Sequence, residues 1–347
     1  MLTVAYELSA LARSPYGGIA QACYNTALQV SKHSEISAHA MYRGGNPANI
    51  TATGLTAHPW SWHSRFTSAK VDILHALCHK LPSLRARRIV YTVHDAWSLY
   101  PNPYQGVEFQ KQFGRRMRAE IERSDMIIAD SEATRRRLLE LGVASENRCR
   151  TVHLGVSAPN EIAITDSRKL IDDVGPAYVL FVGRHEYRKN LRHIVEAVRP
   201  LSGVNLVLVG EPGHGYEESV VPHLAVFPRE RLRRYEHLSP GELTALYRNA
   251  VATLLPSWEE GFGLPILEAM AAGSPVITSD RSASEEIAGD AAILVNPEDP
   301  HASEIAIVQL LEDPAFRDRL IASGKARAAQ FTWTSYFNRL LDIYRSL

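Results

Sequence analysis

The sequence has few cysteines and no excess of charge of either sign. Its three cysteines are Cys23, Cys78 and Cys149, and none forms a Cys-x-x-Cys pair. A sparse, odd set of this kind argues against a disulfide framework or a zinc ribbon, and free thiols suit a reducing compartment. Lys+Arg and Asp+Glu both number 38. No overall basic field therefore exists to bind nucleic acid, and any anionic partner must be held locally.

Other features are missing as well. No apolar run reaches the roughly 18 residues that would indicate a membrane span, and the N-terminus lacks the basic start and apolar stretch of a signal peptide. We therefore expect a cytoplasmic protein, for which peripheral association with the inner face of a membrane stays open. Neither a Gly-x-x-x-x-Gly-Lys-Ser/Thr phosphate loop nor a Gly-x-Gly-x-x-Gly fingerprint is present. The pair His75 and His79 has no matching second cluster of ligands, so we expect no metal site.

Short β-rich runs alternate with amphipathic helical patterns along the chain. This alternation predicts parallel sheets that are covered by helices on both faces. We predict strands at 3–6, 36–41, 72–75, 89–93, 126–129, 178–182, 205–209, 232–235, 252–255 and 276–278. We predict helices from Gly17-Gly18 to about His33 and at 107–124, 132–141, 191–199, 241–249 and 265–272.

The length of 347 residues predicts about two domains. A polar stretch at 159–173 lies between the two series of strands and helices. We therefore expect an N-terminal domain over 1–160 and a C-terminal domain over 161–332. The last segment, 333–347, has apolar residues at helical spacing, and we expect it to return and pack on the N-terminal domain. These residues are Tyr336, Phe337, Leu340, Leu341 and Tyr344.

The most informative segment runs from Pro256 to Gly273 and follows the apolar strand at 252–255. Gly261 and Gly263 allow the backbone to turn tightly and to approach a ligand, and Pro265 suits the first turn of a helix. Strand, glycine loop and helix N-terminus together form an anion-binding arrangement. In an open α/β sheet the ligand binds at the carboxyl ends of the strands.

Two carboxylates flank this turn, Glu260 in the loop and Glu268 in the helix. Both are good acceptors for sugar hydroxyls, and an extended ligand such as a nucleotide sugar could contact both. The alternative is that Glu260 is a solvated loop acid and Glu268 a favourable acid in the first helical turn.

A basic loop, Gly183–Asn190, follows the strand at 178–182. Arg184 and Lys189 are two cations that could stabilise the charge of a departing diphosphate without a metal. Arg188 is adjacent to Lys189 and could compete for that role. The alternative is a solvated basic loop.

Residues 260–276 resemble the signature of family GT4 glycosyltransferases: Glu-Gly-Phe-Gly-Leu-Pro-x-Leu-Glu-Ala-Met-Ala-x-Gly-x-Pro-Val. The resemblance extends to Gly289-Asp290-Ala291-Ala292 and Phe331-Thr332-Trp333. It implies the GT-B fold, in which two Rossmann-like domains face each other across a cleft. It also implies that Glu268 binds the ribose and Glu260 the donor sugar. The loop amides would line the sugar and phosphate site, namely those of Gly261, Phe262, Gly263 and Leu264.

The same resemblance assigns further residues. The pattern Gly-Arg-x-x-x-x-Lys places Arg184 and Lys189 on the diphosphate. His94, after the strand at 89–93, would face the donor sugar with a neutral ring; the alternative is a structural histidine at a strand end. Gly17 and Gly18 would form a loop that closes on the donor, or would simply begin a helix.

The function implied is a retaining transfer of a hexose from a nucleoside-diphosphate sugar, GDP-mannose or a UDP-sugar, to a hydroxyl acceptor. The expected acceptor is a sugar or a lipid-linked saccharide in bacterial surface polysaccharide or glycoconjugate synthesis. No cofactor and no metal are expected, since the Asp-x-Asp motif of metal-dependent transferases of the other major fold is missing. The alternatives are an inactive protein that binds nucleotide sugars, and a phosphorylase or epimerase of the same fold.

Overall fold

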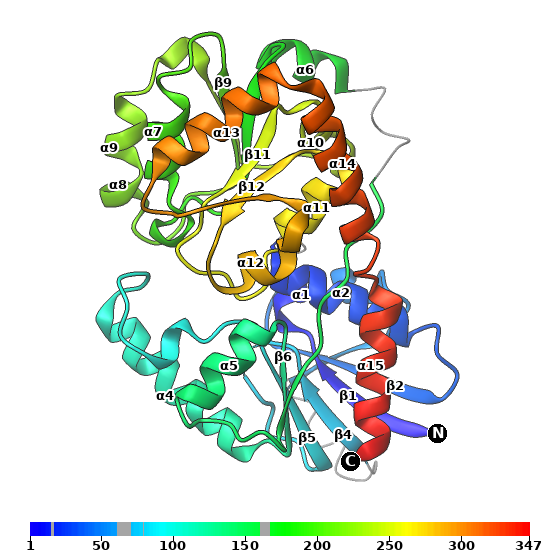
Figure 1. Ribbon diagram of the computed structural model, residues 1–347. Coiled ribbons are helices and arrows are strands. Elements are labelled where there is room, and N and C mark those ends of the chain that lie inside the picture. The colour runs from blue at the N-terminus through cyan, green and yellow to red at the C-terminus, as the bar shows by residue number, and fades with distance from the viewer. Residues whose placement is uncertain (15–16, 61–70, 79, 160–166) are drawn as a thin grey trace. The chain divides into compact units, whose positions relative to one another are not determined.

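The computed structural model describes residues 1–14, 17–60, 71–78, 80–159 and 167–347 (Figure 1). These residues form two compact units. Unit 1 contains Met1–Pro101, Val107–Gly155 and Thr332–Leu347, and unit 2 contains Asn102–Gly106 and Val156–Phe331. The predicted boundary after residue 160 lies outside the described residues.

Unit 1 is built on a parallel sheet with the strand order β3-β2-β1-β4-β5-β6-β7. Val4, Leu74, Val90 and Ile127 on its inner strands are fully buried, which explains the apolar runs in the sequence. The five strands predicted in this half are confirmed. Two strands of three residues, β3 and β7, were not predicted. The strands are β1 (Leu2–Glu7), β2 (Ile36–Tyr42), β3 (Ala57–Pro59), β4 (Val71–Ala76), β5 (Ala86–Val93), β6 (Met126–Ala129) and β7 (Cys149–Thr151).

The helices of unit 1 include the last segment of the chain. They are α1 (Ser9–Arg13), α2 (Gly18–Val30), α3 (Ala48–Thr51), α4 (Val107–Arg123), α5 (Glu132–Glu140) and α15 (Trp333–Ser346). Figure 1 shows α15, in red, beside α2 in blue, and the hydroxyl of Thr26 on α2 lies 3.3 Å from the Tyr336 hydroxyl. The Tyr344 hydroxyl lies 2.5 Å from Nδ1 of His75 on β4. The apolar face of α15 is thus part of the core of unit 1.

Unit 2 repeats this plan with the strand order β10-β9-β8-β11-β12-β13. The strands predicted at 178–182, 205–209, 232–235, 252–255 and 276–278 are all present. The strands are β8 (Tyr178–Val182), β9 (Asn205–Val209), β10 (Leu232–Tyr235), β11 (Ala252–Leu255), β12 (Val276–Ser279) and β13 (Ile293–Val295). The helices are α6 (Arg168–Val174), α7 (Leu191–Val198), α8 (Tyr216–Ser219), α9 (Val221–Ala225), α10 (Pro240–Asn249), α11 (Leu264–Ala272), α12 (Ser282–Ala288), α13 (Pro300–Glu312) and α14 (Pro314–Ala328).

Both sheets have a point where the strand order reverses. In unit 1 this point lies between β1 and β4, and in unit 2 between β8 and β11. Chain segments leave the carboxyl ends of two such neighbours in opposite directions and open a crevice that is the usual ligand site of these sheets. In unit 2 the two segments are the basic loop after β8 and the glycine loop after β11.

Candidate active site

The two loops at the reversal point of unit 2 are hydrogen-bonded to each other through backbone and side-chain groups. Asn190 ends the short 3-10 helix Tyr187–Lys189 with a left-handed φ of 55°. Its side-chain amide donates to the carbonyl of Pro256 at 3.1 Å and to that of Pro297 at 2.8 Å. The Trp258 amide donates to the Arg188 carbonyl at 2.9 Å. The loops therefore form one fixed frame for the side chains between them.

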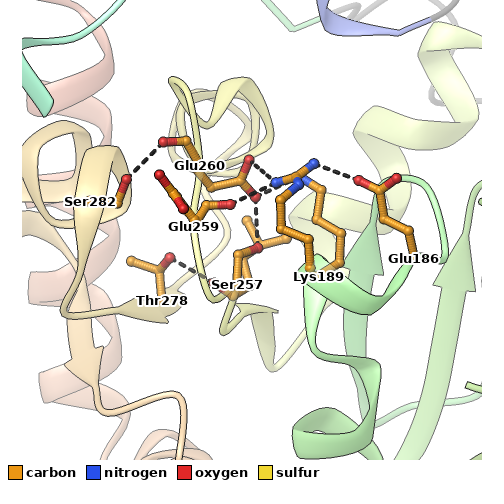
Figure 2. Close-up of polar contacts among 9 residues, drawn as sticks. Glu186, Lys189, Ser257, Glu259, Glu260, Thr278 and Ser282 are labelled. Carbon is orange, nitrogen blue, oxygen red and sulfur yellow. Dashed lines mark hydrogen bonds and ion pairs between the residues drawn. The ribbon is translucent and has the colours of Figure 1, made fainter. Parts of the chain in front are cut away.

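A buried group of charges lies in this frame, and Figure 2 shows the Glu260 carboxylate facing Lys189. Oε1 of Glu260 lies 2.5 Å from Nζ of Lys189 and accepts from the Ser257 hydroxyl at 2.7 Å. Oε2 accepts from Nη1 of Arg188 at 2.9 Å. Nη2 of Arg188 donates to Oε1 of Glu186 at 2.6 Å.

Burial makes these charges depend on one another. The side chains of Arg188, Lys189 and Glu260 are 7%, 11% and 10% exposed. Burial alone would raise the pKa of Glu260, but Lys189 and Arg188 outweigh it and hold that pKa at about 2. Burial and the neighbouring Arg188 lower the pKa of Lys189, and Glu260 opposes that shift. Glu260 is therefore an ionised carboxylate at neutral pH, neutralised by its cationic neighbours.

Of the two cations predicted for the diphosphate, only Lys189 contacts Glu260 among the described residues. Arg184 is exposed at the start of the loop, and its side chain makes none of the described contacts of Glu260. Arg188 occupies that place instead, because the 3-10 turn directs Arg188 and Lys189 inward. The alternative of a solvated basic loop is wrong for these two residues, which are both buried. The sequence signal for Arg188 was its position next to Lys189.

The glycine loop adopts the conformation expected of it. Gly263 caps α11 with a φ of 101°, a left-handed conformation that disfavours other residues, and Pro265 lies in the first turn. Gly261, Phe262, Gly263 and Leu264 are all buried. One turn into α11, Oε2 of Glu268 accepts from the Tyr247 hydroxyl at 3.1 Å. Burial raises the pKa of Glu268, and the Tyr247 bond opposes this.

The predicted residues of unit 1 are Gly17 and Gly18 at the start of α2, and His94 directly after β5. Gly17 precedes α2 with a φ of 94°, and Gly18 is the first residue of the helix. This conformation requires glycine and fits a helix entrance as well as a ligand loop. The preceding residues, Pro15 and Tyr16, lie outside the described residues, as does His79.

His94 differs from its expected state. Its Nδ1 lies 2.6 Å from Oδ2 of Asp130, and its Nε2 lies 2.7 Å from the Leu77 carbonyl. Burial lowers the pKa of His94, but the Asp130 carboxylate and the Leu77 carbonyl outweigh it and raise the pKa to about 9. The expectation of a neutral ring is therefore wrong. The ring is protonated at neutral pH and donates from both nitrogens to protein acceptors, which fits the alternative of a structural histidine.

The described part of the chain offers neither a metal site nor a membrane-spanning helix. No group of three or more His, Cys, Asp and Glu side chains there is arranged to hold a metal ion. No helix within those residues has the length and apolar character needed to cross a membrane.

Comparison with known proteins places these features in context. Residues 29–158 match the family model described as Glycosyltransferase Family 4, and residues 164–327 match the model described as Glycosyl transferases group 1. O-antigen chain mannosyltransferase B of Escherichia coli is 30% identical over 276 residues, which cover 76% of this chain and 71% of that protein. A D-inositol 3-phosphate glycosyltransferase of Nocardioides is 28% identical over 249 residues, covering 65% of this chain and 54% of the relative.

Several solved structures share the fold over the whole length of this chain. The crystal structure of Anabaena HepE in complex with UDP and glucose has a TM-score of 0.81 at 15% identity, with 100% of both chains covered. Sucrose-phosphate synthase of Thermosynechococcus elongatus has a TM-score of 0.76 at 20% identity, covering 100% of this chain and 99% of that one. At these identities the likeness shows the fold, which is the expected GT-B arrangement of two parallel α/β sheets.

Proposed function

Because this chain belongs to glycosyltransferase family 4, the group 1 glycosyltransferases, we propose that it transfers a hexose from a nucleoside-diphosphate sugar to a hydroxyl acceptor with retention at the anomeric carbon. The observation that carries the proposal is the buried group of Lys189, Arg188 and Glu260 at the reversal point of unit 2. Unit 2 would bind the donor, and unit 1 the acceptor.

Lys189 is the proposed ligand of the donor diphosphate. An ammonium group has three donors, and Glu260 accepts from Nζ at 2.5 Å, so the remaining donors can reach phosphate oxygens. The exposed Arg184 would supply a second cation from the same loop. Charge that develops on the departing diphosphate is then stabilised by Lys189, which Glu260 holds in place, and by Arg184. We propose that neither a metal nor a cofactor takes part.

The state of Glu260 supports a front-face displacement. A carboxylate with its pKa held at about 2 by two cations is a weak base and a poor nucleophile. We therefore assign Glu260 to the donor sugar rather than to a covalent intermediate. A departing phosphate oxygen would accept the proton of the attacking hydroxyl, and the new bond would form on the face that the diphosphate leaves.

The other contacts of the donor follow from the same frame. Glu268 would accept from the ribose hydroxyls, and the backbone of Gly261–Leu264 at the N-terminus of α11 would meet the phosphate and sugar oxygens. Gly17 and Gly18 are proposed as further donor-binding residues. His94, with both ring nitrogens engaged, would act by holding the end of β5 in position.

The donor proposed is GDP-mannose or a UDP-sugar. The name of the Escherichia coli relative supports the first, and the UDP bound to Anabaena HepE supports the second. The name of that relative also supports a sugar or lipid-linked saccharide acceptor in surface polysaccharide synthesis. Such an acceptor would require the enzyme to work in the cytoplasm at the inner face of a membrane.

A thermal-shift panel of UDP, GDP, ADP and dTDP tests this function. One nucleotide, at 100 times its dissociation constant, should stabilise the folded protein by about 2.7 kcal/mol. The matching nucleotide sugar should then release its nucleoside diphosphate on turnover. Binding without turnover would indicate an inactive protein, and a sugar 1-phosphate or an epimerised donor as product would indicate a phosphorylase or an epimerase.

A further inference from the structure

The hydrogen-bonding capacity of Glu260 is nearly filled by the protein itself. A carboxylate offers about four acceptor positions, two on each oxygen. Oε1 accepts from Lys189 and from Ser257, whereas Oε2 accepts only from Arg188 among the described residues. One position, on Oε2, therefore remains for a ligand.

Arg188 determines where that remaining position points. Nη1 donates both to Oε2 of Glu260 and to the Glu259 carbonyl, at 2.9 and 2.7 Å. Nη2 donates to Glu186 at 2.6 Å. The planar guanidinium thus holds acceptors from both loops, and turning it toward a phosphate would leave the largely buried Glu186 and Glu260 without this partner.

The backbone of Glu260 is fixed from another side. The Ser282 hydroxyl donates to the Glu260 carbonyl at 2.9 Å (Figure 2). Ser282 itself has a left-handed φ of 58°. A non-glycine residue in this conformation persists where the surroundings hold it. Glu260 is consequently held at its backbone and at both carboxylate oxygens, as a site that reads a hydroxyl group requires.

We propose that Arg188 is a positioning residue that acts through Glu260: it orients Oε2 so that this oxygen accepts one hydroxyl of the donor sugar, and so selects which hydroxyl is recognised. The inference rests on the proposed function. Lysine cannot replace Arg188, because a single ammonium cannot reproduce the planar fork that connects Glu186, Glu260 and the Glu259 carbonyl.

The test compares the accepted donor with its monodeoxy analogues, each lacking one sugar hydroxyl. In the wild type, loss of the hydroxyl that Oε2 accepts should lower kcat/KM by about 10- to 100-fold, as expected for a hydrogen bond to a charged group. In Arg188→Lys that penalty should fall to about 3-fold or less, while the other analogues keep their wild-type ratios. Affinity for the free nucleoside diphosphate should stay within about 3-fold. Arg192→Ala, which removes an exposed arginine paired with Glu196, should keep the wild-type pattern.

Three outcomes separate the possibilities. An unchanged penalty for the deoxy analogue in a folded Arg188→Lys protein would overturn the proposal. If that protein also lost affinity for the free nucleoside diphosphate, Arg188 would be a phosphate ligand instead. If Arg188→Lys does not fold, Glu186→Gln weakens the hold on Nη2 while keeping the Arg188–Glu260 contact, and the same reduction of the penalty is expected. A wild-type protein that turns over no nucleotide sugar would instead contradict the proposed function.

Discussion

At the scale of single residues, Glu260 and Glu268 have the same side chain and opposite electrostatic surroundings. Cations hold the pKa of Glu260 at about 2, whereas burial raises that of Glu268. We predict that Glu268→Ala weakens binding of the free nucleoside diphosphate by about 10-fold or more, because ribose contacts are made with or without the sugar.

Glu260→Ala should behave differently. It should leave the affinity for the free nucleoside diphosphate intact and lower transfer by about 100-fold or more, because Glu260 is assigned to the sugar and not to the nucleotide. Calorimetry with the free nucleotide and steady-state turnover check both variants. The reverse pattern would show that the two carboxylates have been assigned the wrong way round.

The pair of His94 and Asp130 makes stability depend on pH. The pKa of His94 is about 9 in the folded protein and about 6.5 in an unfolded chain. The stabilisation from the protonated ring is therefore fully present below about pH 6.5 and is lost as the pH rises through 9. Between about pH 6.5 and 9.5, we predict that wild type loses about 1–3 kcal/mol more in free energy of unfolding than Asp130→Asn. Urea denaturation at both pH values measures the difference, and parallel losses would contradict it.

The sequence predicted the positions of these residues better than their side-chain contacts and charge states. The positions of Lys189, Glu260 and Glu268 after apolar strands were enough to place them in the loops and the helix that follow β8 and β11. Which arginine turns inward was not predictable, because the choice between Arg184 and Arg188 depends on a short 3-10 turn closed by the left-handed Asn190. The charge of His94 depends on Asp130, 36 residues further along the chain.

At the scale of elements, α15 is the segment whose packing is most open to test. Its Tyr344 hydroxyl lies 2.5 Å from Nδ1 of the fully buried His75. Tyr344→Phe keeps the apolar contacts and leaves that ring nitrogen without this partner, so it should lower the free energy of unfolding by about 1–3 kcal/mol. Arg345→Ala, on the exposed side of the same helix, should change it by less than about 1 kcal/mol. Equal effects of the two substitutions in thermal and urea denaturation would show that the hydrogen bond is unimportant.

Regular elements with several turns or several alternating positions were predictable. Helices α7, α10 and α11 were each predicted to within one residue of their observed bounds. The elements missed in unit 1 are short, as in α1, α3, β3 and β7, with three to five residues each. Such segments are too short to show a helical or a strand period, so tertiary contacts decide their conformation.

At the scale of the whole molecule, we expect cationic side chains, rather than a metal ion, to stabilise the charge of the departing diphosphate. Lys189, which is held by Glu260, and Arg184 from the same loop are the cations proposed for the diphosphate. We predict that turnover of the accepted nucleotide sugar, assayed after dialysis against EDTA and in its presence, stays within about 2-fold of the untreated rate. Activity that disappears in EDTA and is restored only by Mg²⁺ or Mn²⁺ would contradict this.

The central claim is that the buried group at the reversal point of unit 2 binds and activates the donor. The most direct measurement is the rate of nucleoside diphosphate release from the accepted nucleotide sugar by Lys189→Ala, with Arg192→Ala as control. Loss of a preorganised cation should lower kcat/KM by about 100- to 1,000-fold, while Arg192→Ala keeps the wild-type rate and both variants remain folded. A folded Lys189→Ala protein that releases the nucleoside diphosphate at the wild-type rate would contradict the account.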